Sequence, residues 1–584
     1  MTSMQRLGVV LVAVMLLGPA AHAQDWPAFR GPTGQGHSSE RGLPLEWSES
    51  TNVLWKAPVP GRGWSSPVVA DGHVWLTTST DEGAGSLRLL AYDIETGLEV
   101  LNTEVFRVDQ TTSPNPKNSL ASPTPIVDAD ANRVYVHFGA DGTAALTTDG
   151  EILWATHFPH VTQHGNGGSP VLYRDRLILS VDGYDTAFVV ALDAATGEML
   201  WLYRLDEGER GANAIRRMSG RGVAYWTDGQ GDERIFVVTI GYQLVALDAT
   251  TGRPVAEFGT DGIVDLKQHN DQLIDPLTGE IGWNSAPIVA RDVVIVGASH
   301  RSGGSPPSRE NVKGYIRGFD VRTGQRTWIF HTIPRPGEFG RDTWLNDSAV
   351  YTGNTGVWTN LTVDEELGIA YLPIEIPTGD YYGGHRPGDN LFGESLVAVS
   401  LETGERLWHF QFVHHPIWDY DVPCPPILVD IRVDGRDIKA VAQPTKQGWV
   451  YVFDRVTGEP VWPIEERPVE VGNVPGEWYS PTQPFPTKPP PFERQGFPIE
   501  ELIDFTPELR AEALEIVAQY KTGPVFTPPI VRGDNGLMAT LFVPNGANWP
   551  GGSYDPETGI MYLYSHTLMR ALGLVSDPDR SDMD

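Results

Sequence analysis

A turn of the form Asp-x-x-Thr-Gly recurs along the chain, and each copy stands between two short runs of strand-favouring residues. Asp can cap such a turn through its side chain, and Gly accepts the positive φ that a tight hairpin requires. A Trp near the end of most copies offers a large apolar surface to a neighbouring unit. The copies span residues 91–101, 191–201, 246–256, 318–328, 398–408 and 452–462, with a degenerate copy at 146–154. In the copy at 398–408, Ser400 stands in place of the Asp.

A second hairpin pattern precedes most of these turns, so each unit has about four short strands. Four-stranded sheets repeated along a chain are typical of a β-propeller. Seven units are nearly complete, and residues 553–565 predict one further pair of strands. We therefore predict an all-β fold, an eight-bladed β-propeller of four-stranded blades. An early strand at residues 52–60 is expected to complete the last blade and to remove its open edge.

One segment, residues 465–535, breaks the repeat with a Pro-rich stretch and one helix, predicted from Pro507 to Tyr520 with Thr506 as its N-cap. An insertion of this length either lies over one face of the ring or is a surface excursion. Residues 24–584 are predicted to form a single propeller domain around this insertion.

The first 23 residues have the pattern of a secretory signal peptide, with a basic start, an apolar run and a small-x-small site that ends at Ala23. A retained membrane anchor is the alternative, but the apolar run is short. We expect a periplasmic or secreted protein without a transmembrane anchor. The single cysteine, Cys424, permits neither an intrachain disulfide nor a CxxCH haem attachment site. A net charge of −32 argues against a nucleic-acid partner.

The stretch from Val413 to Asp454 gathers the residue types of a functional site. Asp419 and Asp421 flank an aromatic residue, and Lys446 precedes a strong strand. Acidic, aromatic and cationic side chains brought together by strands indicate a site, although Asp421 can equally serve as a turn or hydrogen-bonding residue. The adjacent His414 and His415 suit either a pocket wall or hydrogen bonds to backbone carbonyls.

Longer motifs extend this stretch in both directions, between about Ser219 and Ser565. They include RGVAYW (221–226), FHTIPRPGEFG (330–340), PTGDYYGGHRPGDN (377–390), VHHPIWDYDVP (413–423) and NGANWPGGSYDPETG (545–559). With these motifs the chain resembles the quinoprotein dehydrogenases that use pyrroloquinoline quinone (PQQ), especially their glucose dehydrogenase-like branch. The beginning, DWPAFRGPTGQGHSSERGLPLEW (25–47), instead resembles PQQ-like propeller repeat proteins that are not known to be enzymes.

The resemblance implies a role for each matching residue. Asp419 would be the catalytic base that takes the proton of a substrate hydroxyl, and Lys446 would pair with the quinone oxygens. Trp358 would stack on the planar cofactor, although it can also be a packing residue between blades. The implied cofactor-binding residues are Lys446, Trp358, Thr378, Arg221, Asn548 and Trp549. The implied ligands of Ca²⁺ are Glu310, Asp419 and Thr378.

The chemistry of these residue types agrees with that role. A flat, carboxylated ortho-quinone needs an aromatic platform and cations, and Ca²⁺ needs oxygen ligands. Two positions depart from the sugar-oxidising relatives. Arg301 stands where these relatives carry metal ligands, and Trp226 stands where they can carry His.

We therefore predict an exported oxidoreductase that acts on CH–OH groups, with PQQ and Ca²⁺ as cofactors. It would oxidise an alcohol or sugar by hydride transfer to PQQ and pass the electrons to a separate acceptor, a quinone or cytochrome c. The alternative is a non-catalytic propeller that acts as a binding or assembly scaffold.

Overall fold

The computed structural model describes residues 25–80, 85–108, 118–161, 165–183, 185–216, 222–301, 303–543 and 546–583. The predicted signal peptide and Arg221 lie outside these residues. Within the described ranges, no helix combines the length and the apolarity that crossing a bilayer requires.

The Asp-x-x-Thr-Gly turns have the geometry that their residues predict. At Asp193, Oδ1 accepts hydrogen bonds from the backbone N–H of Thr196 at 2.8 Å and from its hydroxyl at 3.0 Å. Gly197 follows with a φ of +73°, in the left-handed region that favours glycine. Glycines with positive φ end the other turns: Gly97, Gly252, Gly324, Gly404 and Gly458.

Six four-stranded antiparallel sheets, the blades, follow one another along the described chain. The first contains β1 (Val68–Ala70), β2 (His73–Thr80), β3 (Gly85–Asp93) and β4 (Glu99–Val108). The second contains β5 (Ile126–Asp128), β6 (Arg133–His137), β7 (Thr143–Leu146) and β8 (Ile152–Thr156). The third contains β9 (Val171–Tyr173), β10 (Arg176–Asp182), β11 (Ala187–Asp193) and β12 (Met199–Tyr203).

The next three blades repeat this order. The fourth contains β13 (Ala224–Thr227), β14 (Glu233–Val238), β15 (Gln243–Asp248) and β16 (Ile263–Asp265), after the short helix α1 (Gly208–Ala212). The fifth contains β17 (Ile288–Ala290), β18 (Val293–Val296), β19 (Ile316–Asp320) and β20 (Arg326–Phe330). The sixth contains β21 (Thr362–Asp364), β22 (Ile369–Ile374), β23 (Ser395–Ser400) and β24 (Arg406–Gln411).

A three-stranded sheet and a hairpin follow. The seventh blade contains β25 (Ile427–Val433), β26 (Arg436–Pro444) and β27 (Val450–Asp454). Beside β25 lies the antiparallel hairpin of β32 (Gly552–Asp555) and β33 (Ile560–Leu563), which is the pair of strands predicted for residues 553–565. The predicted all-β propeller architecture is confirmed, and the described residues place two strands at the eighth position.

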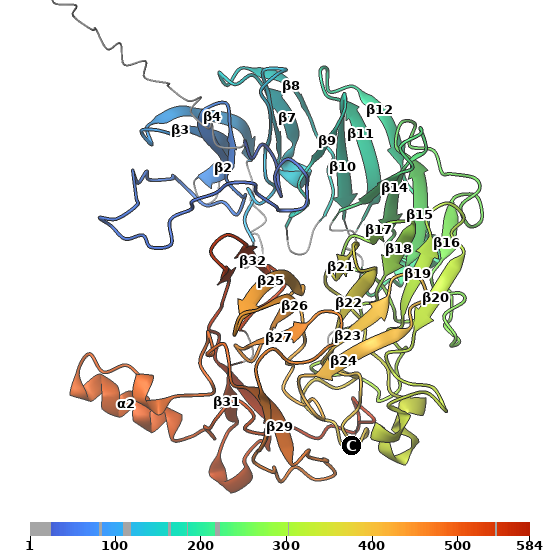
Figure 1. Cartoon of the computed structure of the whole chain (residues 1–584), viewed down its shortest axis with the longest axis vertical. Helices are drawn as coiled ribbons and strands as arrows, with labels where there is room; N and C mark the ends of the chain where they lie inside the picture. Colours follow the sequence, from blue (N-terminus) through green and yellow to red (C-terminus); the bar gives the residue numbers. More distant parts are fainter. Residues whose placement is uncertain are drawn as a thin grey trace, which may run out of the picture.

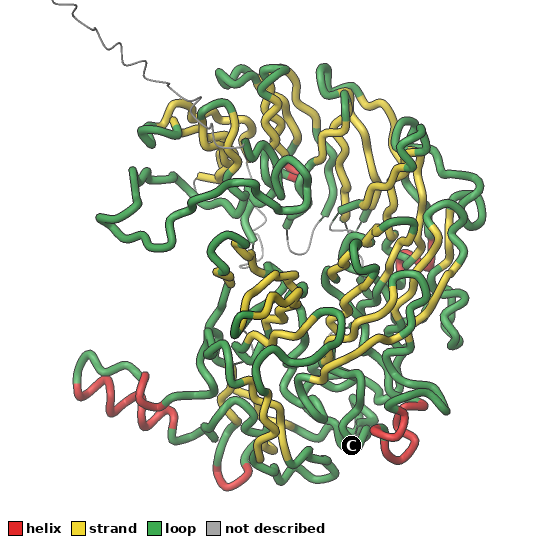
Figure 2. Tube along the Cα trace, viewed as in Figure 1, coloured by secondary structure: helices red, strands yellow, loops and turns green. Residues whose placement is uncertain are grey.

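The hydrophobic core lies between consecutive blades. Leu89 of β3 and Val134 of β6 belong to one fully buried cluster, and Ile295 of β18 and Leu372 of β22 belong to another. Figure 1 shows the blades following one another in an arc, and Figure 2 shows that strands and loops account for nearly all of the chain.

Tryptophans join each of several blades to the next. The indole N–H of Trp328, in β20, donates to the carbonyl of Leu401 in the following blade at 2.8 Å. A Cβ at Gly404 would lie 2.7 Å from this indole, so the turn glycine leaves room for the ring. The same indole-to-carbonyl contact joins Trp154 to Ala194 at 3.1 Å, Trp408 to Arg455 at 3.2 Å and Trp55 to Ile94 at 2.9 Å.

We expect Trp328→Phe to lower the free energy of unfolding by about 1–3 kcal/mol, because the buried carbonyl of Leu401 would lose its donor. Urea unfolding followed by fluorescence and circular dichroism measures this loss. Trp64→Phe is the matched control, because Trp64 is 58% exposed and surface substitutions usually change stability by less than about 0.5 kcal/mol. Equal effects of both substitutions would contradict the role of Trp328.

Residues 52–60, which precede the first blade, do not pair with the last blade as we predicted. Residues 52–60 form no strand, so the predicted completion of the last blade by a strand is wrong. Pro58 and Pro60 offer no backbone N–H for a ladder, and their carbonyls accept hydrogen bonds from Tyr92 and Thr78 of the first blade. Trp55 nevertheless donates its indole N–H to the carbonyl of Ile94 in the first blade. This is the contact that the tryptophan of one blade makes with the next blade.

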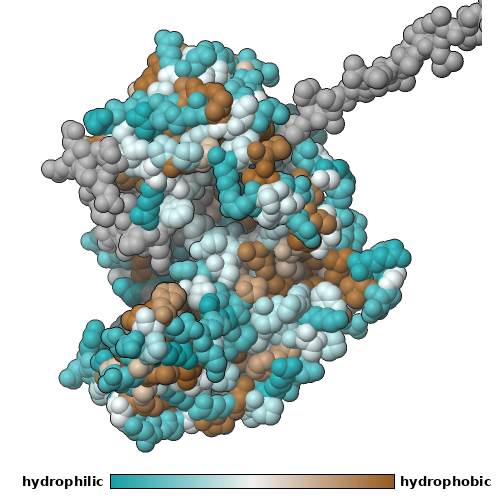
Figure 3. Space-filling model, turned by 90° about the vertical axis from the view of Figure 1, so that its left-hand side faces the viewer, coloured by the Kyte–Doolittle hydropathy of each residue, from teal (hydrophilic) through white to brown (hydrophobic). Residues whose placement is uncertain are grey.

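Contacts between the two ends of the arc involve residues before 52. Trp47 stacks on Tyr562 of β33 with ring centroids 6.2 Å apart, and the backbone N–H of Gly42 donates to Glu557 in the β32–β33 turn. Figure 3, which looks at the side of the opening, shows hydrophobic residues gathered between the upper and lower parts of the molecule. Among the exposed hydrophobic side chains of this N-terminal segment are Trp47 (57% exposed) and Leu54 (87%).

The insertion contains the predicted helix, α2 (Pro507–Val517), which ends three residues earlier than predicted. Thr506 caps it by accepting a hydrogen bond from the N–H of Leu509 at 3.2 Å. Figure 1 shows that α2 projects away from the blades. Short strands flank it: β28 (Ile464–Pro468), β29 (Thr482–Pro486), β30 (Ile530–Val531), β31 (Thr540–Phe542) and the more distant β34 (Arg570–Leu574).

The returning part of the insertion packs against the loop between the sixth and seventh blades. The carbonyl of Thr527 accepts from the indole of Trp418, and the carbonyl of Val525 accepts from the hydroxyl of Tyr420. The insertion therefore supports the stretch that carries Asp419.

Candidate active site

Three loops from two consecutive blades meet around Asp419. Residues 378–381 follow β22, residues 412–426 connect β24 to β25, and Lys446 follows β26. The backbone N–H of Asp419 donates to the carbonyl of Asp380 at 3.2 Å, and Asp419 has a φ of +56°. The loops are thus bonded to each other at the residue predicted to be the base.

Lys446 and Asp419 form the centre of the site. Nζ of Lys446 donates to Oδ1 of Asp419 and to its backbone carbonyl, each at 2.9 Å, and lies 3.6 Å from Oδ2 of Asp421. Burial opposes the charge of the lysine, but the two carboxylates outweigh it and raise the pKa of Lys446. An ammonium group has three N–H donors, so the contacts with Asp419 leave one for a ligand oxygen.

Asp421 holds the indole of Trp358. Its Oδ2 accepts from the indole N–H at 3.3 Å, and its Oδ1 accepts from the backbone N–H of Ile376 at 2.8 Å. Burial raises the pKa of Asp421 to about 6 against the opposing charge of Lys446. These contacts agree with the interpretation of Asp421 as a hydrogen-bonding residue, and they connect it to the predicted stacking residue.

The structure adds acidic and phenolic groups that we did not single out. The hydroxyl of Tyr381 donates to Oδ2 of Asp419 at 3.3 Å. Asp380 is buried, and burial together with the charge of Asp419 raises its pKa well above the ordinary range. Glu375 is also buried and accepts from the N–H of Gly356 at 2.9 Å. Asp380 and Tyr381 belong to the quoted motif PTGDYYGG, which was the available signal for them.

Glu394 is a fully buried acid beside this cluster. Neither carboxyl oxygen has a hydrogen-bond partner among the described residues. Burial, reinforced by the charge of Asp421, raises the pKa of Glu394 well above its ordinary value. The folded protein therefore favours the neutral acid at this position.

This raised pKa predicts how stability depends on pH. Because the folded state holds the proton of Glu394 more tightly than the unfolded state, its contribution is fully present below the unfolded pKa of about 4.3. It is lost as pH rises through the raised folded-state pKa, by at most about 1.4 kcal/mol per pH unit. We expect Glu394→Gln to make stability fall less steeply from pH 5 to pH 9 in urea unfolding. Parallel curves for the wild type and the variant would contradict this assignment.

The predicted metal ligands fall into two places. The hydroxyl of Thr378 donates to Oδ1 of Asn354 at 3.2 Å, and Thr378 lines a cavity of about 40 Å³ together with exposed Glu310. Asp419 is not among the residues that line this cavity. In the part of the chain that the structure describes, no three His, Cys, Asp or Glu side chains are grouped so that they could hold a metal ion.

The segment of Asn548 and Trp549 reaches the backbone of Lys446. The N–H of Gly546 donates to the carbonyl of Lys446 at 2.8 Å. Asn548 accepts from the N–H of Trp549 at 2.9 Å, and Trp549 is 56% exposed. Arg221, predicted to bind a cofactor carboxylate, is outside the described residues.

The two histidines before Asp419 form hydrogen bonds between this loop and neighbouring segments. Nε2 of buried His415 lies 2.9 Å from Glu477 of the insertion, and its Nδ1 lies 2.8 Å from the carbonyl of Gly388. Nε2 of His414 lies 3.1 Å from Glu466. Of the two alternatives for these residues, the contacts favour hydrogen bonding over a pocket wall.

The protein is a β-propeller. Loops of two consecutive blades bring together a buried cluster of carboxylates, a lysine and an indole. The chain belongs to the glucose/ethanol/alcohol dehydrogenase β-propeller family, whose model matches residues 150–584. A second model, for the outer membrane protein assembly factor BamB, matches residues 38–180. The resemblance of the N-terminal part to repeats of PQQ-like propellers is thereby confirmed.

Individual relatives match over part of their length. The glycerol dehydrogenase large subunit of Gluconobacter oxydans is 33% identical over 385 residues, which cover 64% of this chain and 50% of that protein. The quinoprotein glucose dehydrogenase of Escherichia coli is 31% identical over 388 residues, which cover 63% of this chain and 46% of that protein. The chain thus spans about half the length of these relatives.

Solved structures are also similar. The quinohemoprotein alcohol dehydrogenase from Comamonas testosteroni is 22% identical, with a TM-score of 0.45, over 69% of this chain and 52% of that one.

Proposed function

We propose that this protein is a PQQ-dependent dehydrogenase that oxidises the hydroxyl group of an alcohol or a sugar. The observation that carries the proposal is the buried contact of Lys446 with Asp419, at 2.9 Å, held by loops of two blades. PQQ, when bound, supplies a two-electron acceptor for the hydride of the substrate carbon. The relatives named as quinoprotein or glycerol dehydrogenases support this reaction class.

The residues present suit such a cofactor. Lys446 has a remaining N–H donor for a quinone oxygen, and the neighbouring carboxylates keep it charged despite its burial. The half-buried indole of Trp358 is fixed through its N–H by Asp421, so that its ring can serve as a platform. Thr378, Asn548, Trp549 and Arg221 remain proposed cofactor contacts.

Asp419 is the proposed base. It accepts the proton of the substrate hydroxyl while the carbon loses a hydride, so an alcohol becomes a carbonyl compound. A general base of this kind accelerates a reaction by about 10²–10⁴-fold. The hydrogen bonds from Lys446 to Oδ1 and from Tyr381 to Oδ2 fix the orientation of the carboxylate.

A divalent cation fits the charge of the cluster. Asp380, Asp419 and Asp421 surround one lysine, and the pKa of Asp380 is raised by burial and by Asp419. Hard cations such as Ca²⁺ bind carboxylate and other oxygen ligands. We propose that Ca²⁺ compensates this excess of negative charge with Asp419 as a ligand. Thr378 and Glu310 line a separate cavity, so the three predicted ligands do not meet at one ion.

Export and electron transfer are further parts of the proposal. The signal-like residues 1–23 support a periplasmic or secreted protein, and N-terminal sequencing of the exported protein should then begin near Gln24. Reduced cofactor would pass electrons to a separate acceptor, a quinone or cytochrome c.

A non-catalytic scaffold is the second candidate, because the assembly-factor model matches residues 38–180. The cluster around Asp419 lies outside that range, and a scaffold does not need a buried lysine among carboxylates. This cluster favours the enzyme.

Reconstitution tests the function. Purified full-length protein is incubated with PQQ and CaCl₂, and dye reduction is measured across a panel of alcohols and aldoses. We expect saturable PQQ binding and turnover of at least one substrate, both reduced when CaCl₂ is replaced by EDTA. Absence of PQQ binding by folded protein would reject the proposed function.

A further inference from the structure

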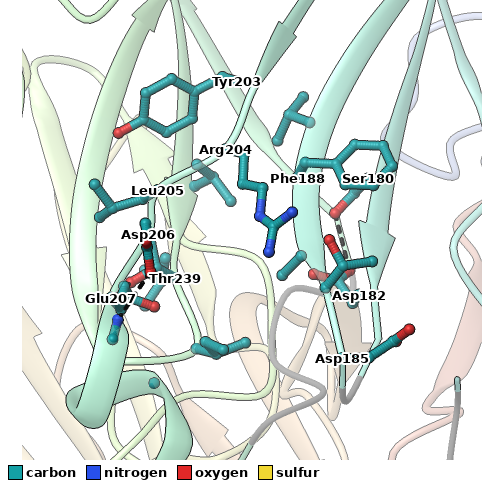
Figure 4. Close-up of a pocket in the computed structure, with 18 of the residues that line it drawn as sticks. Ser180, Asp182, Asp185, Phe188, Tyr203, Arg204, Leu205, Asp206, Glu207 and Thr239 are labelled. Carbon is teal, nitrogen blue, oxygen red and sulfur yellow. Dashed lines mark hydrogen bonds between the residues drawn. The ribbon is translucent and has the colours of Figure 1, made fainter. Parts of the chain in front are cut away.

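A larger cavity lies between the third and fourth blades, away from Asp419. Its volume is about 270 Å³. Figure 4 shows Asp182 and Phe188 on one side, Asp206, Glu207 and Thr239 on the other, and the side chain of Arg204 extending between them.

This cavity is built from the same loop positions as the site around Asp419. Asp182 ends β10, the second strand of its blade, as Thr378 follows β22 in the sixth. Arg204 and Asp206 lie in the connection between the third and fourth blades, as Asp419 lies between the sixth and seventh. Thr239 follows β14, as Lys446 follows β26. The fold therefore presents both sets of side chains on the same face of the arc.

One cationic group of the cavity has no protein partner. Arg204 forms no hydrogen bond or ion pair with another described residue, and its guanidinium lies inside the cavity in Figure 4. Arg204 is exposed, so water or a ligand can reach its guanidinium.

The acidic side chains are held in place by other contacts. Oδ1 of Asp185 accepts from the N–H of Val161 at 2.8 Å, and Oδ1 of Asp206 accepts from Gly208 at 3.1 Å. Glu207 accepts from the Thr239 hydroxyl at 2.6 Å, and also from Gly241 and Gln243. Asp182 accepts from the hydroxyl of Ser180 at 2.9 Å, and burial raises its pKa to about 8, which favours the protonated acid at neutral pH.

These groups select for an uncharged ligand rich in hydroxyl groups. An anion would meet Asp185, Asp206 and Glu207, and a cation would meet the guanidinium of Arg204. Hydroxyl groups can accept from Arg204 and donate to carboxylate oxygens. The rings of Phe188 and Tyr203 offer apolar surface to the C–H groups of a sugar ring, and the volume lies just below the range of about 300–1,000 Å³ for drug-sized ligands.

We propose that the cavity between the third and fourth blades is a second ligand site, separate from the site of Asp419, that binds an uncharged sugar or sugar alcohol of monosaccharide size. Arg204 is its central donor, and the carboxylate oxygens of its walls complete the hydrogen bonding.

Saturation-transfer NMR and titration calorimetry on the full-length protein without PQQ test this site. The probes are D-glucose, D-galactose and D-mannitol, with D-gluconate and D-glucosamine as charged analogues. We expect saturable binding of at least one uncharged probe and weaker binding of both charged ones. Arg204→Gln should weaken that binding by about tenfold or more.

Arg253→Gln is the matched control, because Arg253 is exposed on a neighbouring turn outside the cavity and loses the same charge. Circular dichroism and the unfolding midpoint verify that each variant is folded. The proposal is overturned if no uncharged probe binds, if a charged analogue binds more tightly, or if folded Arg204→Gln binds as well as the control. A crystal soaked with the bound probe would locate it beside Arg204, and density only near Asp419 would overturn the proposal as well.

Discussion

Replacing Asp419 by Asn should lower the kcat of the PQQ-loaded protein by about 10²–10⁴-fold. The amide has the shape of the carboxylate and still offers Lys446 an oxygen acceptor, but it cannot take the proton of a substrate hydroxyl. PQQ binding should therefore persist while turnover is lost. Steady-state dye reduction and equilibrium binding of PQQ measure the two quantities separately.

The control for this substitution is Asp364→Asn. Asp364 is buried and lies 3.3 Å from Arg455, away from the loops around Asp419. We expect this variant to lose stability rather than turnover per folded molecule. Wild-type kcat in folded Asp419→Asn would exclude Asp419 as the base and would leave the cofactor assignment to be judged by PQQ binding.

Replacing Lys446 by Met should lower the free energy of unfolding by about 3–5 kcal/mol, the usual cost of removing one partner from a buried ion pair. Lys446 is 6% exposed and is the cation that faces Asp419 and Asp421, so its loss leaves those carboxylates uncompensated. Urea unfolding monitored by two probes measures this change. PQQ binding should also weaken because the proposed donor to the quinone is gone.

Lys439→Met supplies the comparison, since Lys439 lies on the preceding strand, β26, and pairs with Glu366 at the surface. Exposed pairs of this kind contribute about 0–1 kcal/mol. A similar loss of stability in both variants would show that the buried ion pair of Lys446 contributes no more to the free energy of unfolding than an exposed pair.

The blades could be predicted because their signals are local. Asp193, Thr196 and Gly197 lie within five residues, and their hydrogen bonds and φ angles follow from the residue types alone. The cap of α2 at Thr506 is local as well. The strand predicted for residues 52–60 failed because pairing needs a partner edge, and the carbonyls of Pro58 and Pro60 bond to the first blade instead.

The site was predictable only in part, because some of its contacts join residues that are far apart in the sequence. Asp419 and Lys446 stood out in a motif, and the structure places them in contact. The bond between Trp358 and Asp421 joins residues 63 positions apart, which residue types do not reveal. Burial likewise depends on the packed fold, so the unpartnered carboxyl of Glu394 and the orphan hydroxyl of Tyr203 became apparent only in three dimensions.

The indole contacts between blades have a consequence for cooperativity. Each of these tryptophans bonds to the next sheet along the chain, as Trp328 does to Leu401, so coupling passes from neighbour to neighbour. In such an array, local opening is expected where a unit lacks a neighbour on one side. The two-stranded β32–β33 unit is that place here. Amide hydrogen exchange should therefore be fastest there and slowest in the sixth blade, which the bonds of Trp328 and Trp408 join to both of its neighbours.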